Sequence, residues 1–219
     1  MSVLLSKEIT RLKKKILQMT AIVEESVRKA VSAVRYKNEA LADEVIQNDN
    51  GIDLMENELE EECLKILALH QPVAIDLRYV VVCMKINNDL ERIGDLAVNI
   101  ADRAKAISRE KDDFIPDSIS AMIEKAISML KKSLDAFIEM DLKMAREVSL
   151  MDDEVDELNR NMYQEVRKMI MEDPDRTGYL LHVLGVSRQL ERIGDYATNI
   201  SEDVIYMIEG KIVRHSGSK

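Results

Sequence analysis

The sequence predicts an all-α protein of six long helices, arranged as two repeated three-helix bundles. Three observations carry this prediction. Apolar residues recur at helical spacing in six segments, and no segment shows the strict alternation of a strand. The 219-residue chain holds only 7 Gly and 3 Pro, while good helix formers such as Met, Ala, Leu, Glu and Lys are abundant. A six-residue motif also occurs twice, which indicates an internal repeat.

The first half of the chain contains three of the predicted helices. The first ends near Tyr36, and a turn at Pro72 separates the second from the third. Their apolar rows are Ile9, Leu12, Ile16, Met19, Val23, Val27, Ala30 and Val34; then Val45, Ile52, Met55, Leu59, Ile66 and Leu69; then Leu77, Met84, Leu90, Ile93, Ala97, Ile100, Ala104 and Ile107.

The second half repeats this layout after a polar stretch from Ser108 to Asp117, and Pro174 marks its last turn. The three apolar rows are Ile119, Met122, Ala126, Met129, Leu134 and Phe137; then Val148, Val155, Leu158, Met162, Val166 and Met169; then Leu180, Val183, Leu190, Ile193, Ala197, Ile200, Val204 and Ile208.

The repeat is visible in the residues themselves. Residues 90–95 and 190–195 both read Leu-Glu-Arg-Ile-Gly-Asp, and Asn-Ile follows each copy at the same distance. We therefore divide the chain into a first unit at 1–108, a linker at 109–116, a second unit at 117–212 and a tail at 213–219 that we expect to be frayed. With a shared apolar surface, the two units could pack as one elongated body.

Charge and cysteine content exclude several classes of protein. With 41 acidic and 31 basic residues, the net charge of −10 argues against binding nucleic acid by neutralising phosphates. No apolar run is long enough to span a bilayer, and the N-terminus lacks the pattern of a secretory signal. Cys63 and Cys83 have no CxxC spacing, so we expect buried free thiols in a reducing cytoplasm.

Acidic residues spaced four apart form a stripe on each of two predicted helices. In the first unit the stripe consists of Glu91, Asp95 and Asn99, and no Lys or Arg stands at 87, 88, 94, 98 or 99 to offset it. The second unit repeats it with Glu191, Asp195 and Asn199. Two further pairs have the same spacing on the preceding helices, namely Asp49 with Asp53 and Asp152 with Asp156.

The position of these pairs relative to the turns predicts that they meet. Residues equidistant from the turn of a helical hairpin lie side by side, and Pro72 and Pro174 are midway between the paired acidic positions. Each unit thus has four carboxylates at one level of its hairpin, which predicts a site for a hard cation. Such oxygen ligands favour Fe³⁺, Mn²⁺, Mg²⁺ or Ca²⁺ over Zn²⁺. Solvated acidic faces are the alternative. Gly94 and Gly194 indicate either a close approach by a neighbour or a tolerated glycine.

Catalytic functions find little support. A carboxylate-bridged di-iron enzyme needs two Glu-x-x-His elements, and none of His70, His182 and His215 has a Glu three residues before it. No Ser elbow is present, and no Cys is paired with a His by a recognisable motif. We therefore expect a protein that is not an enzyme, either a metal-binding regulator or a metal-free helical adaptor.

The duplicated Glu-Arg-Ile-Gly-Asp-x-x-x-Asn-Ile element, preceded once by Gln71-Pro72-Val73-Ala74-x-Asp76-Leu77-Arg78, resembles the PhoU family. The resemblance implies two three-helix bundles, a cytoplasmic and peripheral location, and a homodimer. It also implies a negative regulator of the phosphate-starvation response, which links the ATP-binding subunit of the phosphate ABC transporter to a sensor histidine kinase.

The same resemblance implies multinuclear metal clusters, with iron as the first candidate and Mn, Mg, Zn or Ca as others. The implied ligands are Asp49, Asp53, Glu91, Asp95 and Asn99, and in the second unit Asp152, Asp156, Glu191, Asp195 and Asn199. The units differ, because Asp89 is replaced by Gln189 and Asp76-Leu77-Arg78 by Asp175-Arg176-Thr177. The two sites could therefore differ in nuclearity or affinity, and a partner contact near Arg78 would be confined to the first unit.

Overall fold

A computed structural model of the chain describes residues 3–110 and 116–211. Within these ranges it confirms the predicted all-α class with six long helices. The tail at 213–219 and most of the linker lie outside the described residues. The helices are α1 (Val3–Tyr36), α2 (Glu39–His70), α3 (Ala74–Arg109), α4 (Asp117–Glu139), α5 (Leu142–Glu172) and α6 (Thr177–Glu209), with a short 3₁₀ helix η1 (Pro174–Arg176) before α6.

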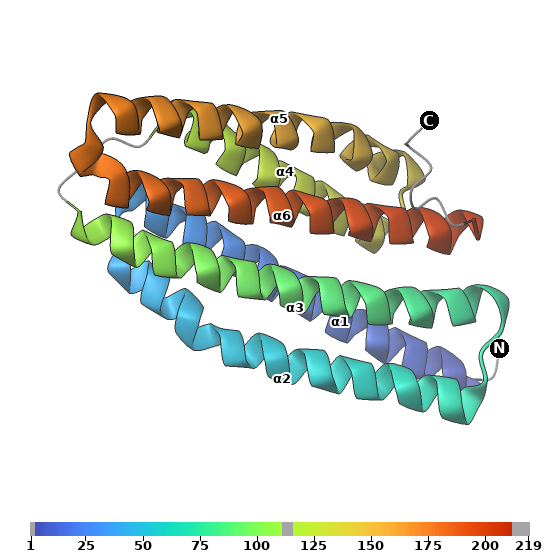
Figure 1. The fold of residues 1–219 in the computed structure, drawn as a ribbon. Helices are drawn as coiled ribbons and strands as arrows, with labels where there is room; N and C mark the ends of the chain where they lie inside the picture. The colour runs from blue at the N-terminus through green and yellow to red at the C-terminus, as the bar shows by residue number, and fades with distance from the viewer. Residues whose placement is uncertain (1–2, 111–115, 212–219) are drawn as a thin grey trace.

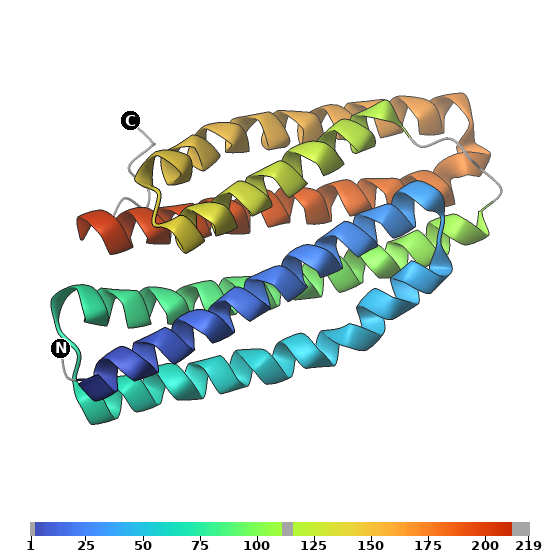
Figure 2. The same cartoon turned by 180° about the vertical axis from the view of Figure 1, so that it is seen from behind.

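Two three-helix units pack side by side along their length (Figures 1 and 2). Helices α3 and α6 lie next to each other at the centre, α2 flanks α3, and α5 flanks α6. Helices α1 and α4 cover the other side of this layer of four helices and touch each other. The units thus form one elongated body with a continuous core.

The predicted apolar rows fill that core almost throughout. Every member of the first row is buried, and so is every member of the fourth. Two residues assigned to rows are exposed instead: Leu69, with 76% of its surface accessible, and Leu77, with 39%. Both lie next to the turn at Pro72, at the end of the α2–α3 hairpin, where helical spacing continues but the packing partners do not.

Local side chains explain where the helices begin and end. Helix α1 stops at Tyr36 because Lys37 adopts a left-handed conformation, and Asn38 then caps α2 by accepting a hydrogen bond from the Leu41 amide. Asp141 caps α5 in the same way, accepting from the Met144 amide at 2.9 Å. The two hairpin turns differ, since α2 ends at a left-handed Gln71 whereas Pro174 starts η1.

The contact between α3 and α6 relates the two units by an approximate two-fold axis. Aligning the two copies of the six-residue motif makes position 85 equivalent to 185 and position 103 equivalent to 203. Lys85 pairs with the buried Asp203 at 3.0 Å, and at the related place the Arg103 guanidinium occupies the space where Gly185 lacks a side chain. One half of this interface therefore holds an ion pair and the other an arginine over a glycine.

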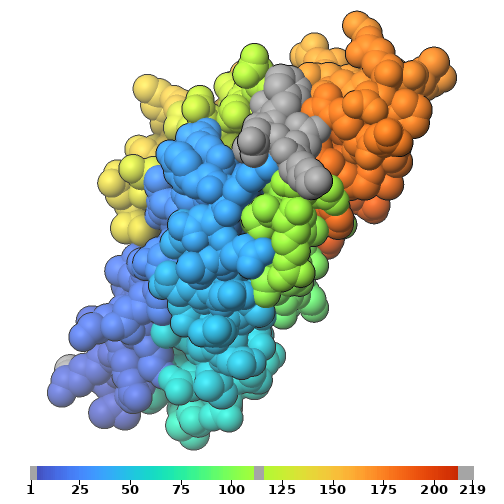
Figure 3. Space-filling view, turned by 90° about the vertical axis from the view of Figure 1, so that its left-hand side faces the viewer, coloured from blue at the N-terminus to red at the C-terminus, as the bar shows by residue number. Residues whose placement is uncertain are grey.

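Both cysteines are buried free thiols, as expected. Burial raises the pKa of Cys63 to about 12, so this thiol stays protonated. Among the described residues no helix is apolar enough over a sufficient length to cross a membrane. Figure 3 shows the end of the molecule at which the α1–α2 turn, the end of α3 and the α5–α6 turn all lie.

Candidate metal centre

The acidic pairs of the first unit meet across the α2–α3 hairpin. We call the side chains of Asp49, Asp53, Glu91 and Asp95 the first acidic patch. Gly94 lies opposite Ile52 and Asp49, because a Cβ added to Gly94 would come 3.1 Å from Ile52 Cδ1 and 3.7 Å from Asp49 Oδ1. The two helices are therefore at the predicted level, and the close approach of α2 accounts for the glycine inside α3.

The second unit repeats the arrangement between α5 and α6, with a second acidic patch of Asp152, Asp156, Glu191 and Asp195. A Cβ added to Gly194 would lie 3.5 Å from Val155 Cγ1 and 3.8 Å from Asp152 Oδ1. Thr198, one turn beyond Gly194, donates a hydrogen bond to Asp152 Oδ1 at 3.3 Å. Thr198 was not among the predicted site residues, although its spacing of three from Asp195 places it beside the patch.

Electrostatics confirm that the carboxylates of each patch influence one another. Burial raises the pKa of Asp49, and the nearby Asp53 and Asp95 raise it further. In the second patch burial raises the pKa of Asp195 to about 6, with added contributions from Glu191, Asp152 and Asp156. A bound cation would stabilise the ionised form of carboxylates whose pKa is raised in this way.

The prediction that the acidic stripe has no basic neighbour is wrong for the first patch. Arg92 lies 3.3 Å from both Glu91 Oε2 and Asp95 Oδ2. Residues one apart on a helix do not face each other, but the long arginine side chain still reaches Glu91. Asp95 is three residues from Arg92, a spacing at which helix side chains meet. In the second patch, Arg160 lies 4.0 Å from Asp156.

The two asparagines, Asn99 and Asn199, lie one turn beyond each acidic patch, at its edge. The Asn99 side chain is exposed and donates its amide to the Asp95 backbone carbonyl at 2.8 Å, while Asn199 is half-buried. Their role as ligands stays a prediction. Arg78, for which we expected a partner contact, makes a contact within the chain instead: its Nε donates to the Met207 carbonyl near the end of α6 at 3.3 Å.

The donor chemistry of both patches suits a hard cation. All eight side chains offer carboxylate oxygens, and the buried Glu91 Oε2 accepts no hydrogen bond from the described residues. In the described part of the chain no three Asp, Glu, His or Cys side chains converge on a single ion-sized position. Binding would therefore require the carboxylates to rotate, which half-exposed side chains can do at small cost.

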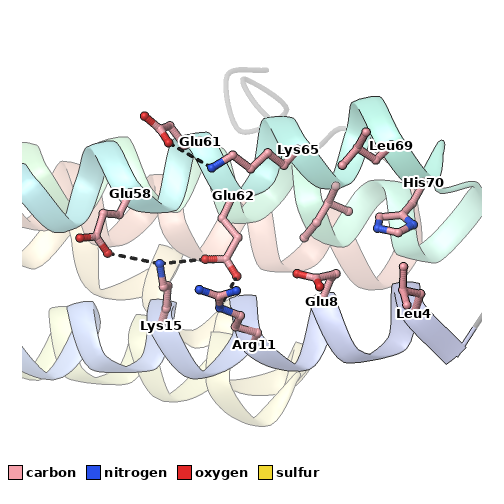
Figure 4. Close-up of a pocket in the computed structure, with 11 residues that line it drawn as sticks. Leu4, Glu8, Arg11, Lys15, Glu58, Glu61, Glu62, Lys65, Leu69 and His70 are labelled. Atoms are coloured by element: carbon pink, nitrogen blue, oxygen red, sulfur yellow. Dashed lines mark hydrogen bonds and ion pairs between the residues drawn. The ribbon is translucent and has the colours of Figure 1, made fainter.

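A separate groove of about 710 Å³ lies between α1 and α2 and was not predicted (Figure 4). Its centre is the buried Glu62, whose oxygens lie 3.3 Å from Arg11 Nε and 2.9 Å from Lys15 Nζ. Lys15 also pairs with Glu58 at 3.2 Å. A basic pair four apart facing an acidic pair four apart is a detectable sequence signal, and here it fastens α1 to α2.

Comparison with known proteins points to one family. The PhoU domain family matches residues 16–104 and again 119–204. The chain is 38% identical over 207 residues to a phosphate-specific transport system accessory protein PhoU homolog from Clostridium acetobutylicum, covering 94% of each. It is 39% identical over 215 residues to the Aquifex aeolicus homolog of the same name, covering 98% of this chain and 97% of that protein.

Solved structures agree. The crystal structure of PhoU from Pseudomonas aeruginosa superposes with a TM-score of 0.91 at 35% identity, covering 94% of this chain and 99% of that chain. The phosphate transport system regulatory protein PhoU from Streptococcus pneumoniae gives a TM-score of 0.87 at 27% identity, covering 95% and 99%.

Proposed function

This chain belongs to the PhoU family, and on that premise we propose that it is an accessory regulatory protein of a phosphate-specific transport system. Support comes from relatives that carry this name and match it along nearly their whole length. In finer terms, we propose a negative regulator of the phosphate-starvation response that acts on the cytoplasmic side. It would link the ATP-binding subunit of the phosphate ABC transporter to a sensor histidine kinase.

The observation that carries the finer proposal is the pair of acidic patches at equivalent places in the two units. Asp49, Asp53, Glu91 and Asp95 would hold metal in one unit, and Asp152, Asp156, Glu191 and Asp195 in the other, with Asn99 and Asn199 at their edges. Iron, manganese, magnesium and calcium are the candidates because all the donors are hard oxygens, and the resemblance to the family puts iron first. The cation would supply the positive charge that these clustered carboxylates lack.

The carboxylates themselves connect α2 to α3 and α5 to α6. Each patch is a site of repulsion between two helices, so neutralising it strengthens the hairpin that carries it. A regulator with such hairpins can present a different surface according to its ion content. The family's homodimer would then offer four patches, and membrane association would come only through the partners.

Elemental analysis of the purified protein tests the metal proposal. Wild type should carry more bound Fe, Mn, Mg or Ca than either Glu91→Ala with Asp95→Ala or Glu191→Ala with Asp195→Ala. Asp153→Ala with Glu157→Ala is the matched control, because these exposed α5 carboxylates have the same spacing but lie outside the patch. Equal ion content in all four proteins would remove the metal from the proposal.

A reporter for phosphate-starvation genes tests the regulatory role. Cells that lack the protein should express the reporter in rich phosphate, and the wild-type gene should restore repression. Normal repression without the protein would contradict the proposal. Restoration by both patch variants, despite lost metal, would favour the metal-free adaptor, in which Arg92 rather than a cation offsets Glu91 and Asp95 of the first patch.

A further inference from the structure

Two buried oxygen atoms on α3 accept no hydrogen bond from the described residues, namely Asn87 Oδ1 and Glu91 Oε2. Asn87 is only 2% exposed. Buried polar side-chain atoms in folded proteins nearly always have a partner, because leaving one unpaired costs free energy. An unpaired amide oxygen next to a carboxylate therefore indicates a ligand that pairs with both.

Asn87 lies at the end of the first acidic patch that is nearer the Pro72 turn. It stands four residues before Glu91, so the two side chains share one face of α3. Its Nδ2 donates a hydrogen bond to the backbone carbonyl of Glu56 on α2 at 2.9 Å. This bond identifies the nitrogen end of the amide, and it places the oxygen of the same planar group in the gap between α2 and α3.

Glu56 brings a second carboxylate to this level. It lies 16 residues from Pro72 and Asn87 lies 15, so the two are neighbours across the helical hairpin. Burial raises the pKa of Glu56. Burial also raises the pKa of Glu91, with further contributions from carboxylates that include Glu56. The side chains of Glu56 and Glu91 are therefore close enough to repel each other.

The second unit has a completed hydrogen bond at the equivalent level. Aligning the acidic pairs and the six-residue motif puts Asn159 in the place of Glu56 and Ser187 in the place of Asn87. The Ser187 hydroxyl donates to Asn159 Oδ1 at 2.7 Å. The fold thus accepts a neutral, paired arrangement here, and the unpaired amide oxygen with its extra carboxylate belongs to the first unit.

We propose that Asn87 Oδ1 and the carboxylates of Glu56 and Glu91 bind one additional divalent cation in the first unit. We call this the Asn87 site; it rests on the proposed metal binding of the acidic patches and adds an ion beside the first of them. An amide oxygen with two carboxylates is a hard donor set suited to Mn²⁺, Mg²⁺ or Ca²⁺, with water completing the coordination. The two carboxylate charges balance the charge of the ion.

Arg92 limits the affinity of the Asn87 site. Its Nε lies 3.3 Å from Glu91 Oε2, the oxygen that the ion would bind. The Arg92 side chain is 50% exposed and can turn into solvent when the ion enters. Because two positive charges compete for one carboxylate, we expect the Asn87 site to fill at a higher ion concentration than the second acidic patch.

Equilibrium dialysis of the full-length protein against Mn²⁺, followed by elemental analysis, tests the proposal. Wild type is compared with an exchange variant, Glu56→Asn with Asn87→Ser, which gives the first unit the residue pair of the second. Because that pair is hydrogen-bonded in the second unit, the variant should remain folded, as circular dichroism checks. At saturating Mn²⁺ the exchange variant should bind one ion per chain fewer than wild type.

The matched control is Glu61→Asn with Asn88→Ser, which makes the same chemical changes and the same loss of charge at exposed positions outside the site. This control should bind as many Mn²⁺ ions as wild type. Equal Mn²⁺ content in wild type and the exchange variant would overturn the Asn87 site, and an equal decrease in the control would do so too. In both cases the ions lost on replacing Glu191 and Asp195 would still report on the acidic patches separately.

Discussion

The two three-helix units share a motif but differ in the basic side chains that neutralise its carboxylates. In the first unit Arg92 pairs with both Glu91 and Asp95. In the described part of the second unit the equivalent Arg192 makes no ion pair, and the patch has only the longer contact of Arg160 with Asp156 at 4.0 Å. The second patch instead holds Asp195 with a pKa raised to about 6. Identical sequence elements thus differ in their ion pairs, because the neighbouring side chains decide the electrostatics of each patch.

Towards their turns the units differ further. The first unit has Glu60 and Glu61 where the second unit has Tyr163 and Gln164. The two units therefore share the carboxylates of the acidic patches, whereas the residues around these patches differ and give each unit its own surface. We expect the unit with less internal compensation to respond more strongly to cations.

Removal of bound ions should give the largest effect. A site held at a free ion concentration one hundred times its Kd stabilises the fold by about 2.7 kcal/mol. Chelation should therefore lower the Tm of wild type, as measured by differential scanning calorimetry. Glu191→Ala with Asp195→Ala should abolish more of this decrease than Glu91→Ala with Asp95→Ala, since Arg92 already offsets the first patch. Equal losses from the two variants would remove the difference between the units.

The interface between α3 and α6 offers a second comparison. Lys85→Ala takes a cation from Asp203, a carboxylate whose side chain is only 2% exposed, and should cost about 2 kcal/mol of unfolding free energy. Arg103→Ala, at the related place, removes only packing over Gly185 and should cost less than about 1 kcal/mol. Urea denaturation measures both. A larger cost for Arg103→Ala would contradict this account of the two-fold interface.

Replacing each motif glycine by alanine should give two variants whose free energies of unfolding differ by about 1 kcal/mol. Alanine is favoured over glycine inside a helix by roughly this amount. Gly194→Ala gains it, because the new Cβ would have ordinary contacts of 3.5 Å or more. Gly94→Ala brings Cβ within 3.1 Å of the buried Ile52 Cδ1, which must shift, so this variant should be less stable than Gly194→Ala. Thermal melts that rank the two variants in the opposite order would disprove the difference in packing.

The smallest effect is expected from Asp195→Asn, and it should depend on pH. The folded state holds the Asp195 proton up to about pH 6, above the ordinary pKa of 3.8. Protonated Asp195 therefore contributes its full stabilisation of the folded state below about pH 4. This contribution to the free energy of unfolding is lost as pH rises through about 6. Without metal, Asp195→Asn should be more stable than wild type at pH 7 by less than about 1 kcal/mol, allowing for solvent screening.

At pH 4 the advantage of Asp195→Asn should nearly vanish, because the wild-type carboxyl is then largely protonated. Asp95→Asn is the matched variant in the first unit. It loses the ion pair with Arg92 and should show a smaller gain or none at pH 7. Urea denaturation at pH 4, 5.5 and 7 in the presence of a chelator would measure both variants, and equal gains would argue against an electrostatic difference between the two patches.

The sequence predicted the six helices, the repeat and the level at which the carboxylates meet. Helical periodicity located each buried row, and the position of Pro72 midway between two acidic pairs was enough to place Asp49 beside Gly94. Such predictions succeed because they depend on local geometry, which a constant rise per residue carries over long helices. Leu69 and Leu77 were misplaced because periodicity does not show where a packing partner ends.

What only the tertiary structure decided depends on contacts between residues far apart in the chain. The pairing of Lys85 with Asp203 and the placing of Arg103 over Gly185 both join α3 to α6, and no spacing within one helix reveals such contacts. Periodicity fixes which face of a helix is buried, since burial follows from the apolar pattern. The charge state of a carboxylate at the edge of that face depends on the distance to other charges and to water, which packing alone determines.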